Sequence, residues 1–239
     1  MSILVTGASS GFGAAICETL INAGYRVIGA ARRLEKLQAL QTELGGNFLP
    51  LQMDVSDTTS VDQALTALPA EFAEIDCLIN NAGLALGLEP APTADFSDWL
   101  TMIQTNIIGL TFLTRQVLPA MLARKQGYVM NIGSIAGSYP YPGGNVYGAS
   151  KAALDHHALC LVAEQHPNLR VVSIAPGVVD TAMQAEIRQA AEQDFPLLPR
   201  FKALKNEGGL SSPQDAAAAI ARFLASPLFG KQVIADIRD

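Results

Sequence analysis

Short apolar runs rich in β-branched residues alternate with longer stretches of helical periodicity along the chain. The predicted strands are 3–5, 26–28, 48–51, 75–79, 128–132, 170–174 and 233–237. Their continuous apolar character is typical of strands that are buried on both faces of a sheet. Helices are predicted between them, for example over 13–23, 34–44, 60–68 and 215–224. Repeated strand–helix units predict a parallel sheet with helices on both faces.

The connections in such units are right-handed, which leads to a doubly wound (Rossmann) α/β fold of about seven strands. No Gly/Ser linker, low-complexity tract or short-period repeat divides the 239 residues, so we expect a single domain over 1–239. The least regular stretch, near 181–212, contains several prolines and glycines. It predicts a pair of helices in a mobile flap over the substrate, because long loops in compact domains are usually functional or disordered.

Composition excludes several classes of protein. A hydrophobic content of 49% with only 16% charged residues indicates a well-filled core. The net charge of −6 argues against general binding of nucleic acid or anionic membranes. The N-terminus lacks the basic segment of a signal peptide, and no apolar run approaches the roughly 18 residues of a membrane span. We expect a soluble cytoplasmic protein with no bound metal, and with Cys17, Cys77 and Cys160 as buried free thiols.

A glycine-rich turn follows the first predicted strand and precedes a helix. Its spacing differs from the G-x-G-x-x-G fingerprint, but the physical logic is the same: a tight turn, close backbone approach and a helix N-terminus that favours anions. The predicted pyrophosphate-binding residues are Gly7, Ser9, Ser10, Gly11, Phe12 and Gly13. The alternative is a turn that only connects strand to helix.

The same segment also fits G-x-S-x-G, the nucleophile turn of α/β-hydrolases, with Ser9 as the nucleophile. Because the motif follows the first strand, no earlier strand and loop can supply the second oxyanion donor. His156, His157 and His166 lie on or near a much later predicted helix, where surface or interface roles suit them better. The hydrolase interpretation is therefore disfavoured.

Arg32 and Arg33 follow the second predicted strand, about 20 residues beyond the glycines. An NAD site is expected to place an acidic residue here for the ribose 2′-hydroxyl. A carboxylate would repel a 2′-phosphate, whereas guanidinium groups bind one through paired donors. The arginines therefore favour NADP, although one of them can equally be a solvated residue at a helix start.

Tyr147 and Lys151 lie four residues apart, so on a helix their polar groups share a face. A free tyrosine titrates near pH 10, and a neighbouring cation lowers that pKa. Reaching about 7 requires a shift of roughly three units, or about 4 kcal/mol. A desolvated ammonium and a cationic cofactor ring are plausible sources. Taken alone, the spacing also fits a partly exposed helix face.

Together these motifs make the chain resemble the short-chain dehydrogenase/reductase family over its whole length. They are the glycine turn, Asp54-Val55, Asn80-Asn81-Ala82-Gly83, Asn106, Ser134, Tyr147 with Lys151, and Pro176-Gly177 with Thr181. The resemblance implies that Asp54 and Val55 meet the adenine, and that Asn81, Ala82 and Gly83 line the cofactor cleft. It also implies that residues from Pro176 through Gly177 and Val179 to Thr181 hold the nicotinamide amide and phosphates.

The family resemblance further implies a mechanism. Ser134 would bind the substrate carbonyl oxygen, and Tyr147 would protonate it while NADPH delivers hydride. Lys151 would bind the nicotinamide ribose and lower the phenol pKa, and Asn106 would hold a water leading to solvent. Simpler roles are a helix cap for Asn106 and a loop serine for Ser134. Such enzymes commonly form homodimers or homotetramers through helices like the one that carries Tyr147.

The substrate is open at this point. The segments 80–90 and 143–149 resemble bacterial NADP-dependent 3-hydroxy acid (serine-type) dehydrogenases, whereas 176–184 and 233–236 resemble sepiapterin and benzil reductases. A hydroxy acid needs a cation, for which Arg188, Arg200 and Lys202 are candidates. A diketone or pterin needs an apolar wall, for which the candidates are Leu84, Leu86, Tyr139, Tyr141, Met183, Phe195 and Leu197. A malonic semialdehyde or serine type of substrate is the first expectation. A non-catalytic NADP-binding regulatory protein is the alternative from another class.

Overall fold

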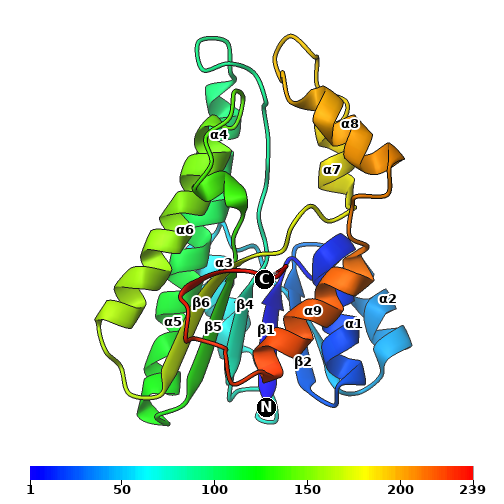
Figure 1. The fold of residues 1–239 in the computed structure, drawn as a ribbon. Coiled ribbons are helices and arrows are strands. Elements are labelled where there is room, and N and C mark those ends of the chain that lie inside the picture. Colours follow the sequence, from blue (N-terminus) through cyan, green and yellow to red (C-terminus); the bar gives the residue numbers. More distant parts are fainter. Residues whose placement is uncertain (239) are drawn as a thin grey trace.

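The computed structural model describes residues 1–238 (Figure 1). Its strands are β1 (Ser2–Thr6), β2 (Arg26–Ala31), β3 (Phe48–Gln52), β4 (Cys77–Asn80), β5 (Gly127–Ile132), β6 (Leu169–Ala175) and β7 (Ile234–Asp236). Its helices are α1 (Gly11–Asn22), α2 (Leu34–Leu44), α3 (Thr58–Thr66), α4 (Phe96–Ile103), α5 (Leu110–Ala123), α6 (Asn145–Ala163), α7 (Ala182–Ile187), α8 (Leu198–Asn206) and α9 (Pro213–Ala225). A π-helical segment, η1 (Gln104–Gly109), joins α4 to α5, and a 3₁₀ turn, η2 (Ile135–Gly137), follows β5.

The seven strands form one parallel sheet in the order β3-β2-β1-β4-β5-β6-β7. Leu4 pairs with Ile28 on one side and with Leu78 on the other, so β1 and β4 lie in the middle of the sheet. All seven predicted strands are present; β2 extends three residues beyond its predicted end, and every other end differs by at most two residues. The predicted doubly wound parallel fold is confirmed.

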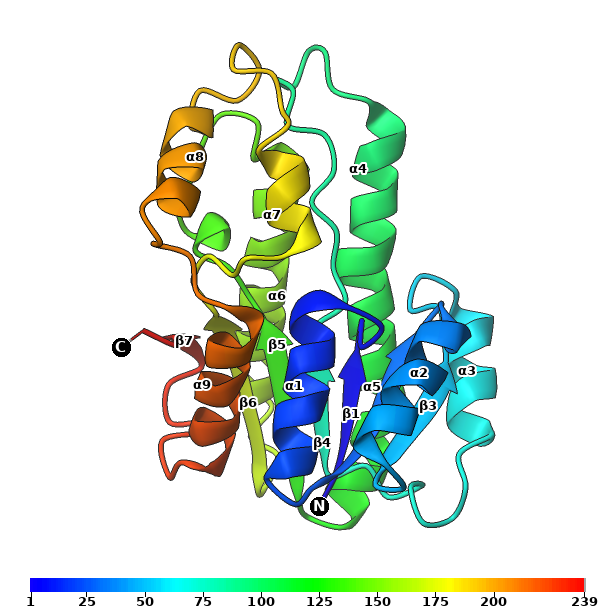
Figure 2. The same cartoon turned by 90° about the vertical axis from the view of Figure 1, so that its right-hand side faces the viewer.

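Helices cover both faces of the sheet (Figures 1 and 2). Alternate residues of β1 point to opposite faces, as the pleat of a strand requires. Ile3 and Val5 join a core with residues of α1, α2 and α9, whereas Leu4 joins a second core with residues of α3, α5 and α6. Both faces of β1 are thus removed from water, which explains its unbroken apolar sequence.

The order of the strands fixes the place of the site. The chain passes from β3, at one edge, back to β4 beside β1, so the connections after β1 and β4 diverge to opposite faces. In a doubly wound sheet, ligands bind at the carboxyl ends of the strands at such a switch point. The helices α7 and α8 lie above this end of the sheet, remote from the labelled N-terminus (Figure 2). Two helices were predicted in this flap, and both are present.

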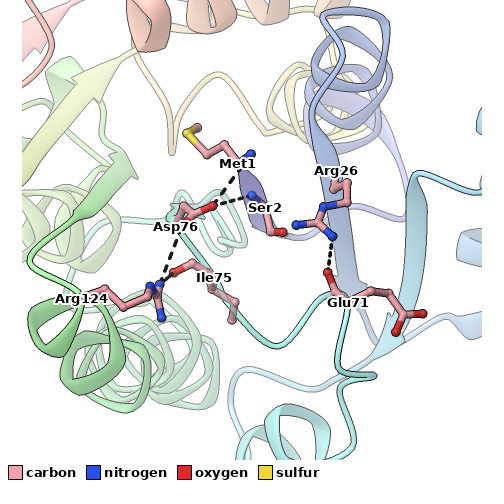
Figure 3. Close-up of polar contacts among 7 residues, drawn as sticks. All are labelled: Met1, Ser2, Arg26, Glu71, Ile75, Asp76 and Arg124. Carbon is pink, nitrogen blue, oxygen red and sulfur yellow. Dashed lines mark hydrogen bonds and ion pairs between the residues drawn. The ribbon is translucent and has the colours of Figure 1, made fainter.

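Polar contacts hold the other end of the sheet (Figure 3). Asp76, just before β4, accepts a hydrogen bond from the Ser2 backbone N–H at 2.8 Å. Its other oxygen lies 3.8 Å from Arg124 Nη2, and Arg124 also donates to the Ile75 carbonyl. These contacts tie β1, β4 and the end of α5 together at the end remote from the site.

From the sequence, no apolar run was expected to be long enough to cross a membrane. Among the described residues, one continuous helical stretch, Phe96–Ala123, is long and apolar enough by length and composition, with a mean hydropathy of 1.2. Its residues Leu113, Val117 and Met121 belong to the core beneath the sheet. Because these residues pack against the sheet, we interpret the stretch as a core helix of the domain.

Candidate active site

The glycine turn after β1 is shaped by close backbone contact. Gly7 and Gly11 have φ angles of +69° and +55°, a region that glycine occupies without steric cost. Gly13 has a different constraint: a Cβ there would lie 2.3 Å from the Gly7 carbonyl oxygen and 2.6 Å from Asn81 Nδ2. The first turn of α1 therefore packs directly on the glycine turn, and its N-terminus faces the carboxyl end of the sheet.

Thr6 holds the segment after β4 against this turn. Its Oγ1 accepts hydrogen bonds from the backbone N–H groups of Asn81 (3.0 Å) and Ala82 (2.9 Å), and Asn81 Nδ2 donates to the Thr6 carbonyl at 2.8 Å. Sequence reasoning did not assign Thr6 this role. A buried threonine at the end of a strand gives no signal until the neighbouring strand is known.

Two adjoining cavities lie at the carboxyl end of the sheet and share Gly7, Ser10, Ala82 and Gly83. The larger, about 680 Å³, is called the catalytic cleft here; the smaller, about 310 Å³, lies over β2 and β3. Every residue predicted to bind the cofactor lines one or both. The catalytic cleft contains Gly11, Phe12, Gly13, Asn81, Tyr147, Lys151, Pro176, Gly177, Val179 and Thr181, and the smaller cavity contains Ser9, Arg32, Arg33, Asp54 and Val55.

Arg33 reaches across the smaller cavity to the glycine turn. Its Nη2 donates to Ser9 Oγ at 2.9 Å and to Ser10 Oγ at 2.7 Å. These contacts argue against Ser9 as a hydrolase nucleophile. Its hydrogen-bond partner is a guanidinium, which stays protonated and cannot accept a proton from Ser9 as a general base would. They also place a cation beside the hydroxyl groups of the turn.

Tyr147, Lys151 and Ser134 meet on the wall of the catalytic cleft. Tyr147 and Lys151 lie one turn apart on α6, and the Lys151 ammonium is 5.8 Å from the centroid of the Tyr147 ring. The Lys151 Nζ donates to the Ile132 carbonyl at 2.8 Å. The Ser134 hydroxyl accepts a hydrogen bond from the Ala136 N–H at 3.2 Å, which caps η2, and it is close enough to the Tyr147 phenol to influence its pKa.

Burial dominates the titration of this group of residues. It raises the pKa of Tyr147 above its usual 10, against a smaller opposing effect of the Ser134 hydrogen bond. The prediction of a lowered phenol pKa is therefore wrong for the protein chain alone, because desolvation of the phenolate outweighs its neighbours. Burial also lowers the pKa of Lys151 to about 8, and the nearby Asp155 carboxylate opposes that shift.

Asp155 is a part of the site that sequence reasoning missed. It lies four residues after Lys151 on α6 and accepts a hydrogen bond from Ser173 Oγ of β6 at 2.5 Å. Burial raises the pKa of Asp155, while Ser173 and Lys151 favour its charged form. The i, i+4 spacing from Lys151 was the available signal.

Asn106 is buried in the π-helical segment η1. Its side chain accepts from the Leu84 N–H at 2.8 Å and donates to the Leu84 carbonyl at 2.8 Å and to Ser150 Oγ at 3.0 Å. These bonds engage both amide donors, so Asn106 fixes the chain after β4 against α6. It does not cap a helix. Its predicted role in binding a water stays a prediction.

The three candidate cations for a substrate carboxylate are separated by the structure. Arg188 lines the catalytic cleft, whereas Arg200 and Lys202 are exposed on α8 and do not line it. Asp180, which the sequence analysis did not select, lies between Arg188 and Lys205 in the same cleft. Hydrogen bonding to Lys205 is the largest of the effects that lower the pKa of Asp180.

The proposed apolar wall is mostly dispersed. Met183 lines the catalytic cleft and also packs in the apolar cluster of the flap, which contains Phe195, Leu197 and Tyr141, but these three do not line the cleft. Leu84 lines the smaller cavity, Leu86 lines a different cavity, and Tyr139 is 73% exposed. Only one of the seven candidates thus lies in the catalytic cleft.

The histidines and cysteines lie outside the two cavities. His156 and His157 are on α6, and His166 contacts Glu164 on the surface. Cys17 and Cys77 are buried free thiols as predicted, and burial raises the pKa of each. Cys160 is exposed on α6, because it occupies the face of that helix away from the sheet, so its predicted burial is wrong.

Comparison with known proteins gives consistent matches. The family model described as "short chain dehydrogenase" matches residues 1–192. An NADP-dependent 3-hydroxy acid dehydrogenase of Salmonella typhi is 44% identical over 92% of this chain and 87% of its own. A serine 3-dehydrogenase of Rhizobium radiobacter is 48% identical over 75% of this chain and 72% of its own.

Solved structures agree. A closed form of serine dehydrogenase complexed with NADP⁺ superposes with a TM-score of 0.86 and 41% identity, covering 99% of this chain and 94% of that one. An actinorhodin polyketide ketoreductase variant with NADPH gives a TM-score of 0.85 at 28% identity, covering 98% and 94%. The glycine turn, the Ser134–Tyr147–Lys151 group and these matches agree: the chain belongs to the short-chain dehydrogenase family.

Proposed function

We propose that the protein is an NADP-dependent oxidoreductase that interconverts a 3-hydroxy acid and the corresponding 3-oxo acid, of the malonic semialdehyde or serine type. The observation that carries the proposal is the shared catalytic cleft. Its walls include the glycine turn, the Ser134–Tyr147–Lys151 group and Arg188, a cation suited to a carboxylate. Relatives named for 3-hydroxy acids or serine support the same substrate class.

The residues of the two cavities fit a dinucleotide. Gly7 and Gly13 pack too closely against Asn81, Ala82 and the Gly7 carbonyl for either to carry a Cβ, so the glycine turn is held against the N-terminus of α1. A helix N-terminus of this kind is suited to bind a pyrophosphate. Arg32 and Arg33 line the smaller cavity with no acidic residue beside them in sequence, and guanidinium donors match a ribose 2′-phosphate. Asp54 and Val55 lie in the same cavity, where they would hold the adenine.

The catalytic roles follow from the geometry of the cleft. When bound, NADPH supplies a hydride to the carbonyl carbon. Ser134 would orient the carbonyl oxygen, and the Tyr147 phenol would transfer its proton to that oxygen as the hydroxyl group forms. The raised pKa of Tyr147 keeps the phenol protonated at neutral pH, as an acid requires. Lys151 would bind the cofactor ribose and favour the phenolate left after proton transfer.

The other candidate functions have less support. A benzil or sepiapterin substrate would need an apolar wall, and most of the residues suggested for one lie outside the catalytic cleft. A non-catalytic NADP-binding regulator would not require Ser134, Tyr147 and Lys151 to line one cavity. We therefore place the 3-hydroxy acid first.

A substrate comparison tests this proposal. NADPH oxidation would be followed with malonic semialdehyde, benzil and sepiapterin, and NADP⁺ reduction with 3-hydroxypropionate and L-serine. We expect the highest kcat/KM for malonic semialdehyde in the reductive direction, and for 3-hydroxypropionate, its reduced form, or L-serine in the oxidative direction. A higher kcat/KM for benzil or sepiapterin would contradict the 3-hydroxy acid assignment, and no turnover with any of the five would favour the regulator.

We further propose a cytoplasmic homodimer or homotetramer built from one domain over 1–239, with the segment 181–212 as its substrate flap. Apolar side chains on α4, η1 and α6 support an interface on that side of the sheet. They are Phe96, Leu100, Ile108, Leu159 and Val162, all exposed. Sedimentation velocity should give a dimer or tetramer, and a monomer at micromolar concentration would contradict the proposal.

A further inference from the structure

Arg188 is held in the catalytic cleft in an unusual electrostatic setting. Within the described residues, three cationic side chains line this cleft: Lys151, Lys205 and Arg188. Lys151 is buried and engaged with the Ile132 carbonyl. Lys205 is 49% exposed, whereas Arg188 is only 16% exposed. Arg188 is thus the flap cation whose charge is least screened by water.

Asp180 orients Arg188 without neutralising the cluster. One oxygen of Asp180 lies 3.5 Å from Arg188 Nη2, and its other oxygen pairs with Lys205 Nζ. Two cations therefore share one carboxylate, which leaves one unit of positive charge among these three side chains. A second carboxylate beside Arg188, the most covered of the three side chains, would complete the charge balance of Arg188, Asp180 and Lys205.

The hydrogen bonds of Arg188 are also incomplete. Its Nη1 is buried and has no hydrogen-bond partner, and the same is true of Gln184 Oε1, one helical turn earlier on α7. Leaving a buried donor of a charged group unpaired is costly, so Arg188 Nη1 marks a place where an acceptor is expected, whereas Gln184 Oε1 is itself an acceptor and calls for a donor. Both residues line the catalytic cleft that contains Tyr147.

We propose that Arg188 binds the carboxylate of the substrate, with Asp180 as the residue that positions it. The proposal rests on the 3-hydroxy acid function given above and assigns its specificity to one side chain of the flap. A carboxylate suits the two-pronged donor geometry of a guanidinium. Arg238, near Gly177, pairs with Asp236 and does not line the catalytic cleft, so it is not a candidate for this role.

The test compares a charged substrate with a neutral one. For Arg188→Met, kcat/KM for 3-hydroxypropionate should fall about 100-fold, mainly through KM, as expected when one partner of a shielded charge pair is removed. The kcat/KM for the methyl ester of 3-hydroxypropionate should change less than about threefold, because the ester lacks the charge. The Kd for NADPH, measured by fluorescence, should be unchanged. Arg188→Lys keeps the positive charge, so its kcat/KM for 3-hydroxypropionate should fall less than that of Arg188→Met.

Arg200→Met is the matched control, because Arg200 lies on the same flap but does not line the cleft. In Arg200→Met, the kcat/KM for the acid, the kcat/KM for the ester and the Kd for NADPH should all stay within about twofold of the wild type, as is usual for surface changes. Equal losses of Arg188→Met on the acid and the ester, or a weaker Kd for NADPH, would overturn the role of Arg188. If the wild type turns over benzil or sepiapterin and not the hydroxy acid, the proposed function itself fails, which is a different outcome from failure at Arg188.

Discussion

Arg33 donates a hydrogen bond from Nη2 to the Ser10 hydroxyl oxygen at 2.7 Å, which joins the end of β2 to the turn that opens α1. Residues of both elements line the smaller cavity. This contact keeps a guanidinium where a ribose phosphate would bind, and it gives the first prediction.

Replacing Arg32 and Arg33 together by alanine should raise the Kd for NADPH about 10- to 100-fold, the loss expected for charge-assisted hydrogen bonds. The Kd for NADH should change less than about threefold, since NADH has no 2′-phosphate. Fluorescence titration measures both constants. Lys36→Ala, an exposed change on α2, controls for net charge and should leave both constants unaltered. Equal weakening of NADPH and NADH would refute the 2′-phosphate role.

The packing of Gly13 gives the second prediction. In Gly13→Ala the new Cβ would lie 2.3 Å from the Gly7 carbonyl oxygen, so the glycine turn must move. We expect the free energy of unfolding to fall by about 1–3 kcal/mol, the usual cost of overpacking, and NADPH binding to weaken. Denaturant unfolding and fluorescence titration measure the two effects. Gly46→Ala is the control, because a Cβ there meets nothing within 4 Å. Equal behaviour of the two variants would contradict the close packing of this turn.

The lowered pKa of Lys151, about 8, gives the third prediction. Between about pH 8 and the ordinary lysine pKa near 10.4, the unfolded chain binds a proton at Lys151 that the folded chain has lost. The stability of the wild type therefore rises with pH in this window relative to Lys151→Met, in which the group is absent. Between pH 7 and pH 9.5, the free energy of unfolding of the wild type should rise by about 2 kcal/mol relative to that of Lys151→Met.

Urea unfolding at the two pH values measures this difference. The same change at exposed Lys36 on α2 should show no such dependence on pH. A difference between wild type and Lys151→Met that stays constant with pH would show that burial does not disfavour the Lys151 charge.

The fold was predictable because its signals are local. Each strand buried on both faces, such as Ile3–Leu4–Val5, is a continuous apolar run, and the glycines at 7, 11 and 13 mark a turn that no larger residue fits. The helix α4 and the π-helical segment η1 were not specified, because their residues depend on packing against α6. Burial of Cys160 was predicted wrongly for a related reason, since the sequence does not say which face of α6 meets the sheet.

The site was predictable wherever a motif has fixed spacing, as for Tyr147 and Lys151 on one helix. Contacts between distant segments gave no such signal. Thr6 binds the backbone 75 residues away, and Asp155 meets Ser173 only because β6 lies beside α6. The sign of the Tyr147 pKa shift was also missed, because the cost of burying a phenolate depends on the whole cleft.

The most direct test of the account is the steady-state rate of Tyr147→Phe with NADPH and malonic semialdehyde, measured beside its Kd for NADPH. The change removes one oxygen atom and keeps the ring. The account predicts that kcat falls by at least about 100-fold, the usual contribution of a positioned acid, while the Kd for NADPH stays within about threefold of the wild type. A variant that keeps the wild-type rate would contradict the central claim that Tyr147 is the proton donor of this enzyme.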